Sequence, residues 1–258
     1  MVEVLVYFGE VGKAREHVAE MREAYGRIQR NQRLSPGQAA AAEAQFMRAS
    51  SRVEHEVGNY AEAERLVRRA IAANTRLIAT LPQGPDRPLE ATYNSLFMRN
   101  DLARILLAQG RLLEAEVEGR AALLGRLTLQ GRNAGETLLS VVGLGRIILQ
   151  QGRSAEAERL GRAALESLDA MKYEPDSTLY ETSLFLVASA EAQQGNWEAA
   201  ARTYEGLRQR IAGRPDMLRK SFDANRHWGM TALRTGRVDE ARRVLSNVVE
   251  IHRQRYGE

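Results

Sequence analysis

The 258-residue chain contains no cysteine and very little lysine. Without cysteine, this sequence forms no disulfide, no thiolate metal site and no cysteine nucleophile. Only Lys13, Lys172 and Lys220 stand among its 37 basic residues, so the positive charge is almost wholly arginine. The formal net charge is only +4, and no arginine run is dense enough to resemble a nucleic-acid-binding arm. We therefore expect no nucleic-acid partner.

Long hydrophobic segments are missing as well. The longest apolar segment, residues 138–149, includes Arg146 and is about half as long as a membrane-spanning helix requires. The first ten residues have neither a basic leading region nor an evident cleavage site of a signal peptide. These features predict a cytoplasmic protein with no membrane partner.

Residue patterns of metal sites and active sites are also absent from the sequence. Helical metal sites usually need two histidines four residues apart, and no pair among His17, His55, His227 and His252 has that spacing. The serines have no nucleophile-elbow sequence around them, and the glutamates recur at equivalent positions rather than forming a single exception. We expect no catalytic residue, no cofactor, no metal and no enzymatic activity.

What the chain does contain is repetition. Residues 109–123, "QGRLLEAEVEGRAAL", and residues 151–165, "QGRSAEAERLGRAAL", are identical at 11 of 15 positions. Aligning the glycine of this motif gives five turns separated by 52, 42, 43 and 41 residues, at Gly58, Gly110, Gly152, Gly195 and Gly236. The long interval includes "LPQGPDRP", residues 81–88, which predicts an additional loop. A regular period of this length is typical of a solenoid of stacked units.

Each unit is predicted to be a pair of helices joined at the glycine, which suits a helix end that needs a positive φ. A small residue in the first helix stands twelve positions before an alanine in the second, and we expect these pairs to let the two helices approach closely. The pairs are Ser51/Ala63, Ala103/Ala115, Gly145/Ala157, Ala188/Ala200 and Gly229/Ala241. The large residues before four of the small ones are predicted core: Leu102, Leu144, Val187 and Trp228.

This pattern resembles the tetratricopeptide repeat (TPR), in the 42-residue variety of kinesin light chains. The resemblance is carried by segments such as "NDLARILLAQGRLLEAE", residues 100–116, and covers nearly the whole chain. It implies an all-α, right-handed superhelical solenoid of antiparallel helix pairs, with about eleven helices. We expect one array over residues 1–258, with a partial unit at 1–33 and units at approximately 34–81, 87–130, 133–173, 175–213 and 215–258.

Both ends of the array depart from a complete solenoid. The first turn, near Gly9, would need a first helix from residues before Met1, and no polar capping helix follows the last pair. The sequence is therefore interpreted as a fragment of a larger bacterial multidomain protein.

The resemblance also implies which residues face the concave groove of the array. These are the residues three before and one after each small residue of the first helices. They are Arg48, Arg52, Asn100, Arg104, Val142, Arg146, Phe185, Ser189, Arg226 and Met230. Four of the five units place at least one arginine there, which predicts a groove for a protein or peptide partner, and the arginines favour an acidic one.

Two classes of function remain open. The first is a protein–protein interaction scaffold that binds a peptide or partner segment in its groove. The second is the regulatory or substrate-recognition half of a larger enzyme, such as one with a caspase-like peptidase domain. The groove arginines also have a simpler interpretation, as ordinary surface residues of an arginine-rich chain.

Overall fold

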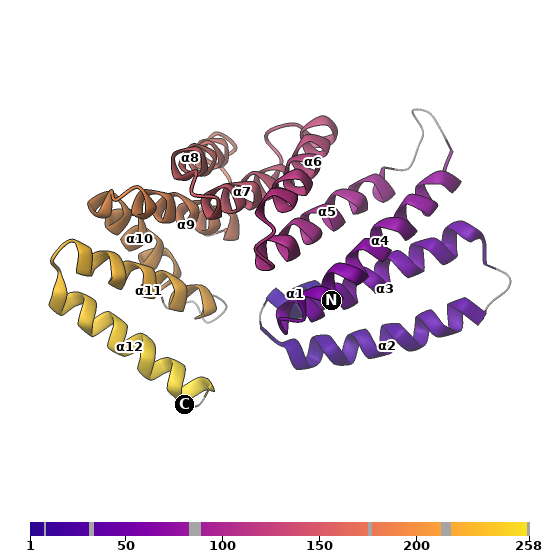
Figure 1. Cartoon of the computed structure of the whole chain (residues 1–258), viewed down its shortest axis with the longest axis horizontal. Helices are drawn as coiled ribbons and strands as arrows, with labels where there is room; N and C mark the ends of the chain where they lie inside the picture. Colours follow the sequence, from indigo (N-terminus) through magenta and orange to yellow (C-terminus); the bar gives the residue numbers. More distant parts are fainter. Residues whose placement is uncertain (8, 31–33, 83–88, 175–176, 213–217, 257–258) are drawn as a thin grey trace. The chain divides into compact units, whose positions relative to one another are not determined.

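A computed structural model describes residues 1–7, 9–30, 34–82, 89–174, 177–212 and 218–256. Those residues form helices and connecting turns and contain no strand, so the predicted all-α class is confirmed (Figure 1). The helices are α1 (Val2–Tyr7), α2 (Val11–Arg30), α3 (Pro36–Glu56), α4 (Tyr60–Thr80), α5 (Glu90–Ala108), α6 (Leu112–Gln130), α7 (Gly135–Gln150), α8 (Ser154–Ala170), α9 (Thr178–Gln193), α10 (Trp197–Ile211), α11 (Leu218–Arg234) and α12 (Val238–Tyr256).

The backbone divides into two compact units, Met1–Leu129 and Gln130–Glu258. We call them unit 1 and unit 2. Unit 1 holds α1 to α5 and all but the last residue of α6, and unit 2 holds α7 to α12. Helices that follow one another pack side by side from α1 to α5 in unit 1 and from α7 to α12 in unit 2, as α3 and α4 or α9 and α10 do in Figure 1.

The five repeat glycines end the first helix of each pair, as predicted. Each has a positive φ between 76° and 81°. At Gly110, its amide donates to the Leu107 carbonyl at 3.0 Å, and the amide of Arg111 donates to the Leu106 carbonyl at 2.9 Å. This pair of bonds is the Schellman motif, which satisfies the last carbonyls of the helix and reverses the chain.

The N-terminal helix α1 differs from the expectation. We expected the first turn to lack a preceding helix, but α1 provides a short one before Gly9 and brings the described helices to twelve. Val2 and Val6 of α1 are buried, so its apolar residues join the core of unit 1. The segment is short for a helix, and packing rather than helix propensity stabilises it.

The small residues pack helices together, although not always with the expected partner. The Ser51 hydroxyl donates to the Ala63 carbonyl at 2.7 Å, which confirms the predicted contact within the α3–α4 pair. Gly145 is predicted to meet Ala157. In the structure, the space that a Cβ of residue 145 would occupy is filled by the Leu186 side chain of α9. Gly161 of α8 faces the neighbouring Val187 in the same way. In unit 2, therefore, Gly145 and Gly161 make room for the first helix of the following pair, whereas Gly229 of α11 faces Leu245 of α12 in its own pair.

The predicted core residues before the small positions are buried. Leu102, Leu144, Val187 and Trp228 are each no more than 3% exposed. Most of the proline-rich segment 81–88 lies outside the described residues, and α4 ends at Thr80 before it. No helix of the described chain is both long enough and apolar enough to cross a membrane.

Candidate functional site

Two arginines of α3 converge on one carboxylate of α5 in unit 1. Arg48 Nε donates to Asp101 Oδ2 at 2.8 Å. Arg52 binds the same carboxylate with two bonds, from Nε to Oδ2 and from Nη2 to Oδ1, both at 3.1 Å. A third guanidinium, that of Arg104, lies 4.0 Å from Oδ1. Three predicted groove arginines therefore gather around one acid, which we call the Asp101 cluster (Arg48, Arg52, Asp101 and Arg104).

The cluster is largely removed from solvent. The side chains of Arg48, Arg52 and Asp101 are 18%, 11% and 6% exposed. Burial by itself would raise the pKa of Asp101, but the positive charges of Arg52, Arg48 and Arg104 outweigh it, and the pKa lies below its usual value. Asp101 therefore stays ionised at neutral pH. Three positive charges against one negative charge leave the cluster a formal charge of +2.

A cavity of about 590 Å³ opens beside this cluster within unit 1. Its lining includes Arg48 and Arg52 of α3, further polar side chains of α2, α3, α4 and α5, and apolar side chains between them. The polar group is His17, Gln45, Asn74, Glu90 and Asn94, and the apolar group includes Met21, Leu77, Leu81 and Met98. Glu90 adds one carboxylate, so the cluster and the lining together keep a positive balance. Concave sites with an apolar lining and a few polar groups are typical of ligand sites.

Arg48, which lines this cavity, has unused hydrogen-bonding capacity. Its Nη2 atom is buried and has no hydrogen-bond partner in the structure. Its guanidinium carbon lies 5.1 Å from the centre of the Phe97 ring, and the buried Arg126 lies over that ring at 4.3 Å. A buried donor without a partner costs free energy. A ligand carboxylate that reached Arg48 would remove that cost.

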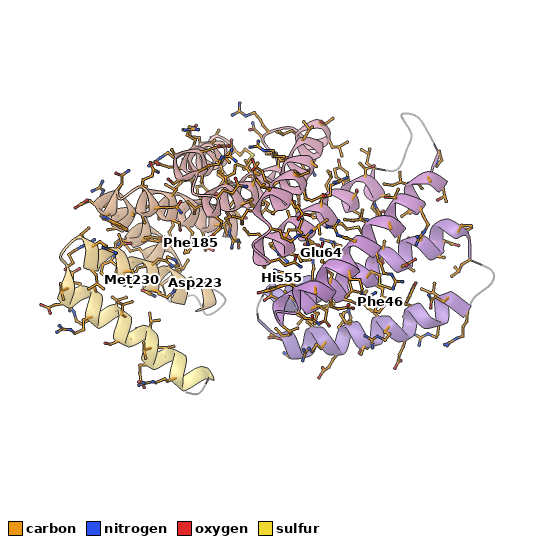
Figure 2. All side chains as sticks on the ribbon, in the orientation of Figure 1. Phe46, His55, Glu64, Phe185, Asp223 and Met230 are labelled. Carbon is orange, nitrogen blue, oxygen red and sulfur yellow. The ribbon has the colours of Figure 1, made fainter. Side chains whose placement is uncertain are left out.

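Helices α9, α10 and α11 of unit 2, which correspond to α3, α4 and α5 of unit 1, carry an aromatic cluster instead. Phe185 of α9 meets the Tyr204 ring at 5.7 Å and the His227 ring at 5.0 Å, and Tyr204 stacks on His227 at 5.6 Å. The hydroxyls of Ser189 and Tyr204 are hydrogen-bonded at 2.8 Å. We call this group, Phe185, Ser189, Tyr204 and His227, the aromatic cluster. Figure 2 shows Phe185 on α9, and Asp223 and Met230 on α11.

Burial shifts both titratable groups of the aromatic cluster toward their neutral forms. It raises the pKa of Tyr204 to about 12, although the hydrogen bond with Ser189 opposes this. It also lowers the pKa of His227 below 6.5, and the nearby Arg226 acts in the same direction. The bond between His227 Nδ1 and the Asp223 carbonyl oxygen, at 2.8 Å, opposes the shift. The aromatic cluster is therefore uncharged at neutral pH, in contrast to the Asp101 cluster.

The other predicted groove residues are distributed over both units. Asn100 is half-buried on α5, and Arg146 is exposed on α7. Val142 is buried in the core of unit 2, where it offers no surface to a ligand. Arg226 Nη2 lies 3.7 Å from Asp223 Oδ1 on the same helix. The Met230 side chain is 55% exposed.

Sequence reasoning missed Asp101, Tyr204 and His227. Asp101 and His227 occupy the same register position, two residues before the small residues Ala103 and Gly229. The other first helices have Ala49, Gly143 and Leu186 there. A carboxylate or an imidazole at a position that is otherwise apolar was a visible signal. This position is not one of those that the repeat family places in the groove.

Among the described residues, no group of three or more histidine, aspartate or glutamate side chains could hold a metal ion. The shifted pKa values at the candidate site arise from ion pairing at Asp101 and from burial at Tyr204 and His227. The fold is that of a TPR-like repeat protein.

The comparisons with known proteins agree with this class. A family model described as "Tetratricopeptide repeat" matches residues 139–163 and 229–246. No curated protein matches the sequence.

Solved structures share the fold at low sequence identity. A structure from Podosopora anserina, a putative kinesin light chain with nearly identical TPR-like repeats, is 18% identical, with a TM-score of 0.60 over 87% of this chain and 99% of that chain. BtubC (BKLC) from P. vanneervenii is 16% identical, with a TM-score of 0.65 over 96% and 91%. The apo form of RapI is 14% identical, with a TM-score of 0.68 over 98% and 84%. The TPR-like fold suggests a protein–protein interaction scaffold.

Proposed function

We propose that the chain binds an extended acidic peptide of a partner protein, and that a carboxylate of this peptide enters the cavity of unit 1. The observation that carries the proposal is the buried Nη2 of Arg48, which has no hydrogen-bond partner although Arg48 lines the cavity. A carboxylate is the matching acceptor, because it forms charge-assisted bonds with a guanidinium.

The surroundings favour a peptide over a small anion. The cavity lining alternates amides with apolar surface, and the amides of Gln45 and Asn94 can bond a peptide backbone. The half-buried Met21 and Leu77 offer contacts to the side chains beside the acidic one. Methionine-rich surfaces adapt to varied apolar groups. The lining can therefore hold an acidic residue of a peptide together with its neighbours.

Arg48 and Arg52 are unsuitable for charge reversal, because both bind a buried carboxylate. Reversing Arg48 or Arg52 would remove a partner of buried Asp101 and destabilise the fold itself. Gln45→Glu with Asn94→Asp instead adds two negative charges to the cavity lining without a change of size. The matched control is Gln193→Glu with Asn247→Asp, at exposed positions of α9 and α12 in unit 2.

The probe is a fluorescein-labelled hexaglutamate peptide, followed by fluorescence anisotropy at low salt. The cavity variant should bind it more than tenfold more weakly, since a charge-assisted bond contributes roughly 1.5 to 3 kcal/mol and tenfold corresponds to about 1.4 kcal/mol. The control should change the affinity less than about twofold, and salt should weaken binding to the parent chain. Equal losses in both variants, or no binding by the parent chain, would contradict the proposal.

The alternative, a regulatory or substrate-recognition half of a larger enzyme, concerns a catalytic domain outside these residues. No observation on the described residues favours it over a scaffold. The peptide site we propose is compatible with either, because regulatory arrays also act by binding.

A further inference from the structure

Helix α6 carries a row of large apolar side chains in contact with solvent. Leu113, Val117, Leu124 and Leu127 are 77%, 65%, 67% and 40% exposed. The exposed Arg120 lies between them, and the five residues are separated by four, three, four and three positions. This spacing places all five on one face of the helix, as in the seam of a coiled coil. We call this row the α6 stripe.

The stripe is specific to the helix pair of α5 and α6. Its four apolar residues lie 3, 7, 14 and 17 positions after the turn glycine Gly110. The sixteen equivalent positions lie in α4, α8, α10 and α12, except for Ala212, which directly follows α10. They hold alanine, polar and charged residues and no large apolar side chain. On α8, for example, the equivalents are Ala155, Arg159, Glu166 and Asp169. A general property of the fold therefore does not explain the stripe, and exposed apolar rows of this kind mark interaction surfaces.

We propose that the α6 stripe is a self-association surface that pairs antiparallel with the α6 stripe of a second copy of this chain. The stripe is nearly symmetric about Arg120. In an antiparallel pair centred there, Leu113 meets Leu127 of the other copy, and Val117 meets Leu124. A two-fold contact requires such a self-complementary surface.

The charges fit the same arrangement. Arg120 forms an ion pair with Glu116 of its own helix at 2.6 Å, so each copy brings a neutral pair to the centre rather than a bare positive charge. In the paired arrangement the two Arg120 side chains meet at the centre, and the Glu116 carboxylate that pairs with each of them offsets their charge. The two ends of the stripe are Leu113 and Leu127. These apolar ends favour a second copy of the stripe over a strongly acidic or basic partner.

One helix pair covers less area than the roughly 1,200 Å² of a standard stable interface, so the dimer should be weak and dependent on concentration. Sedimentation velocity over about 1 µM to about 1 mM should show the mass rising from 28.8 kDa toward twice that value. Val117→Glu with Leu124→Glu should keep the chain monomeric throughout. Ala155→Glu with Ala163→Glu, which adds the same charge to the exposed face of α8, should leave the association unchanged.

A cross-linking experiment tests the geometry without disturbing the apolar residues, because the chain has no cysteine of its own. Arg120→Cys should form a covalent dimer with a short bismaleimide. Arg68→Cys is the control, since Arg68 stands at the equivalent position of α4 and has the same type of pair, with Glu64. Equal cross-linking of both variants, a parent chain that stays monomeric, or a dimer that survives the double glutamate substitution would each overturn the proposal. None of these measurements depends on the acidic peptide.

Discussion

Unit 1 and unit 2 place different chemistry at the same register position of the repeat. Asp101 of unit 1 collects guanidinium groups from two helices, whereas His227 of unit 2 lies against Phe185 and Tyr204. Both positions are held by similar helix pairs and the same glycine turn. The comparison shows that the backbone of the repeat fixes where a side chain lies, while the residue there decides whether the site is charged or aromatic.

We expect the largest loss of stability when the negative charge of Asp101 in unit 1 is removed. Asp101→Asn keeps the size of the side chain but leaves Arg48 and Arg52 without their buried counter-charge. Losing one partner of a buried ion pair costs about 3 to 5 kcal/mol. Chemical denaturation should show that loss, and hydrogen exchange should locate the opening in α3 and α5. An unfolding free energy equal to that of the parent chain would show that the ion pairs contribute little.

A second prediction concerns helix packing in unit 2. Gly145→Ala places a methyl group against Leu186, which is itself buried, and should cost about 1 to 3 kcal/mol because a tightly packed contact must open. Gly143→Ala, on the same helix, has nothing within 4 Å of the new methyl group. It should stabilise the chain by about 0.5 to 1 kcal/mol through helix propensity. Thermal unfolding of the two variants should move in opposite directions, and a shared direction would disprove this account of the packing.

A smaller effect is expected at the aromatic cluster. Tyr204→Phe keeps the ring contacts with Phe185 and His227 and removes only the hydrogen bond to Ser189. The free energy of unfolding should fall by about 0.5 to 1.5 kcal/mol. A larger loss than that of Asp101→Asn would reverse our ranking of the two clusters.

The two units should also lose stability in different pH ranges. The pKa of His227 is lowered by folding, so the unfolded chain binds the proton first, and stability falls as the pH drops below the ordinary value of 6.5. The pKa of Asp101 is also lowered, from an ordinary value of 3.8, so its contribution is complete above that pH and is lost only in stronger acid. Denaturation at a series of pH values should show the first step in the parent chain and not in His227→Phe. A first step that persists in that variant would assign it to another group.

Much of the fold could be predicted from the sequence because local rules specify it. The repeated glycines predicted the turns, since only a residue that tolerates a positive φ can end these helices in a Schellman motif. The residues before the small positions were correctly predicted as core. These features depend on neighbours within one helix pair.

The rest depends on contacts between distant parts of the chain. The bonds of Arg48 and Arg52 to Asp101 span 53 and 49 residues and arise because α3 and α5 approach each other. The partner of Gly145 proved to be Leu186, because the gap left by a glycine is filled by whichever helix is nearest in space. Periodicity gives the face on which a residue lies but not the side chain that it meets.

In the function we propose, Arg48 of unit 1 receives a carboxylate from an acidic peptide. The most direct measurement is a nuclear magnetic resonance titration that follows the Nε–H signals of the arginine side chains during addition of hexaglutamate. Our account predicts a saturable shift of the Arg48 signal, with little change at Arg159 and Arg162 on the exposed face of α8. Shifts of similar size at all three arginines, or an unchanged Arg48 signal at saturation, would contradict it.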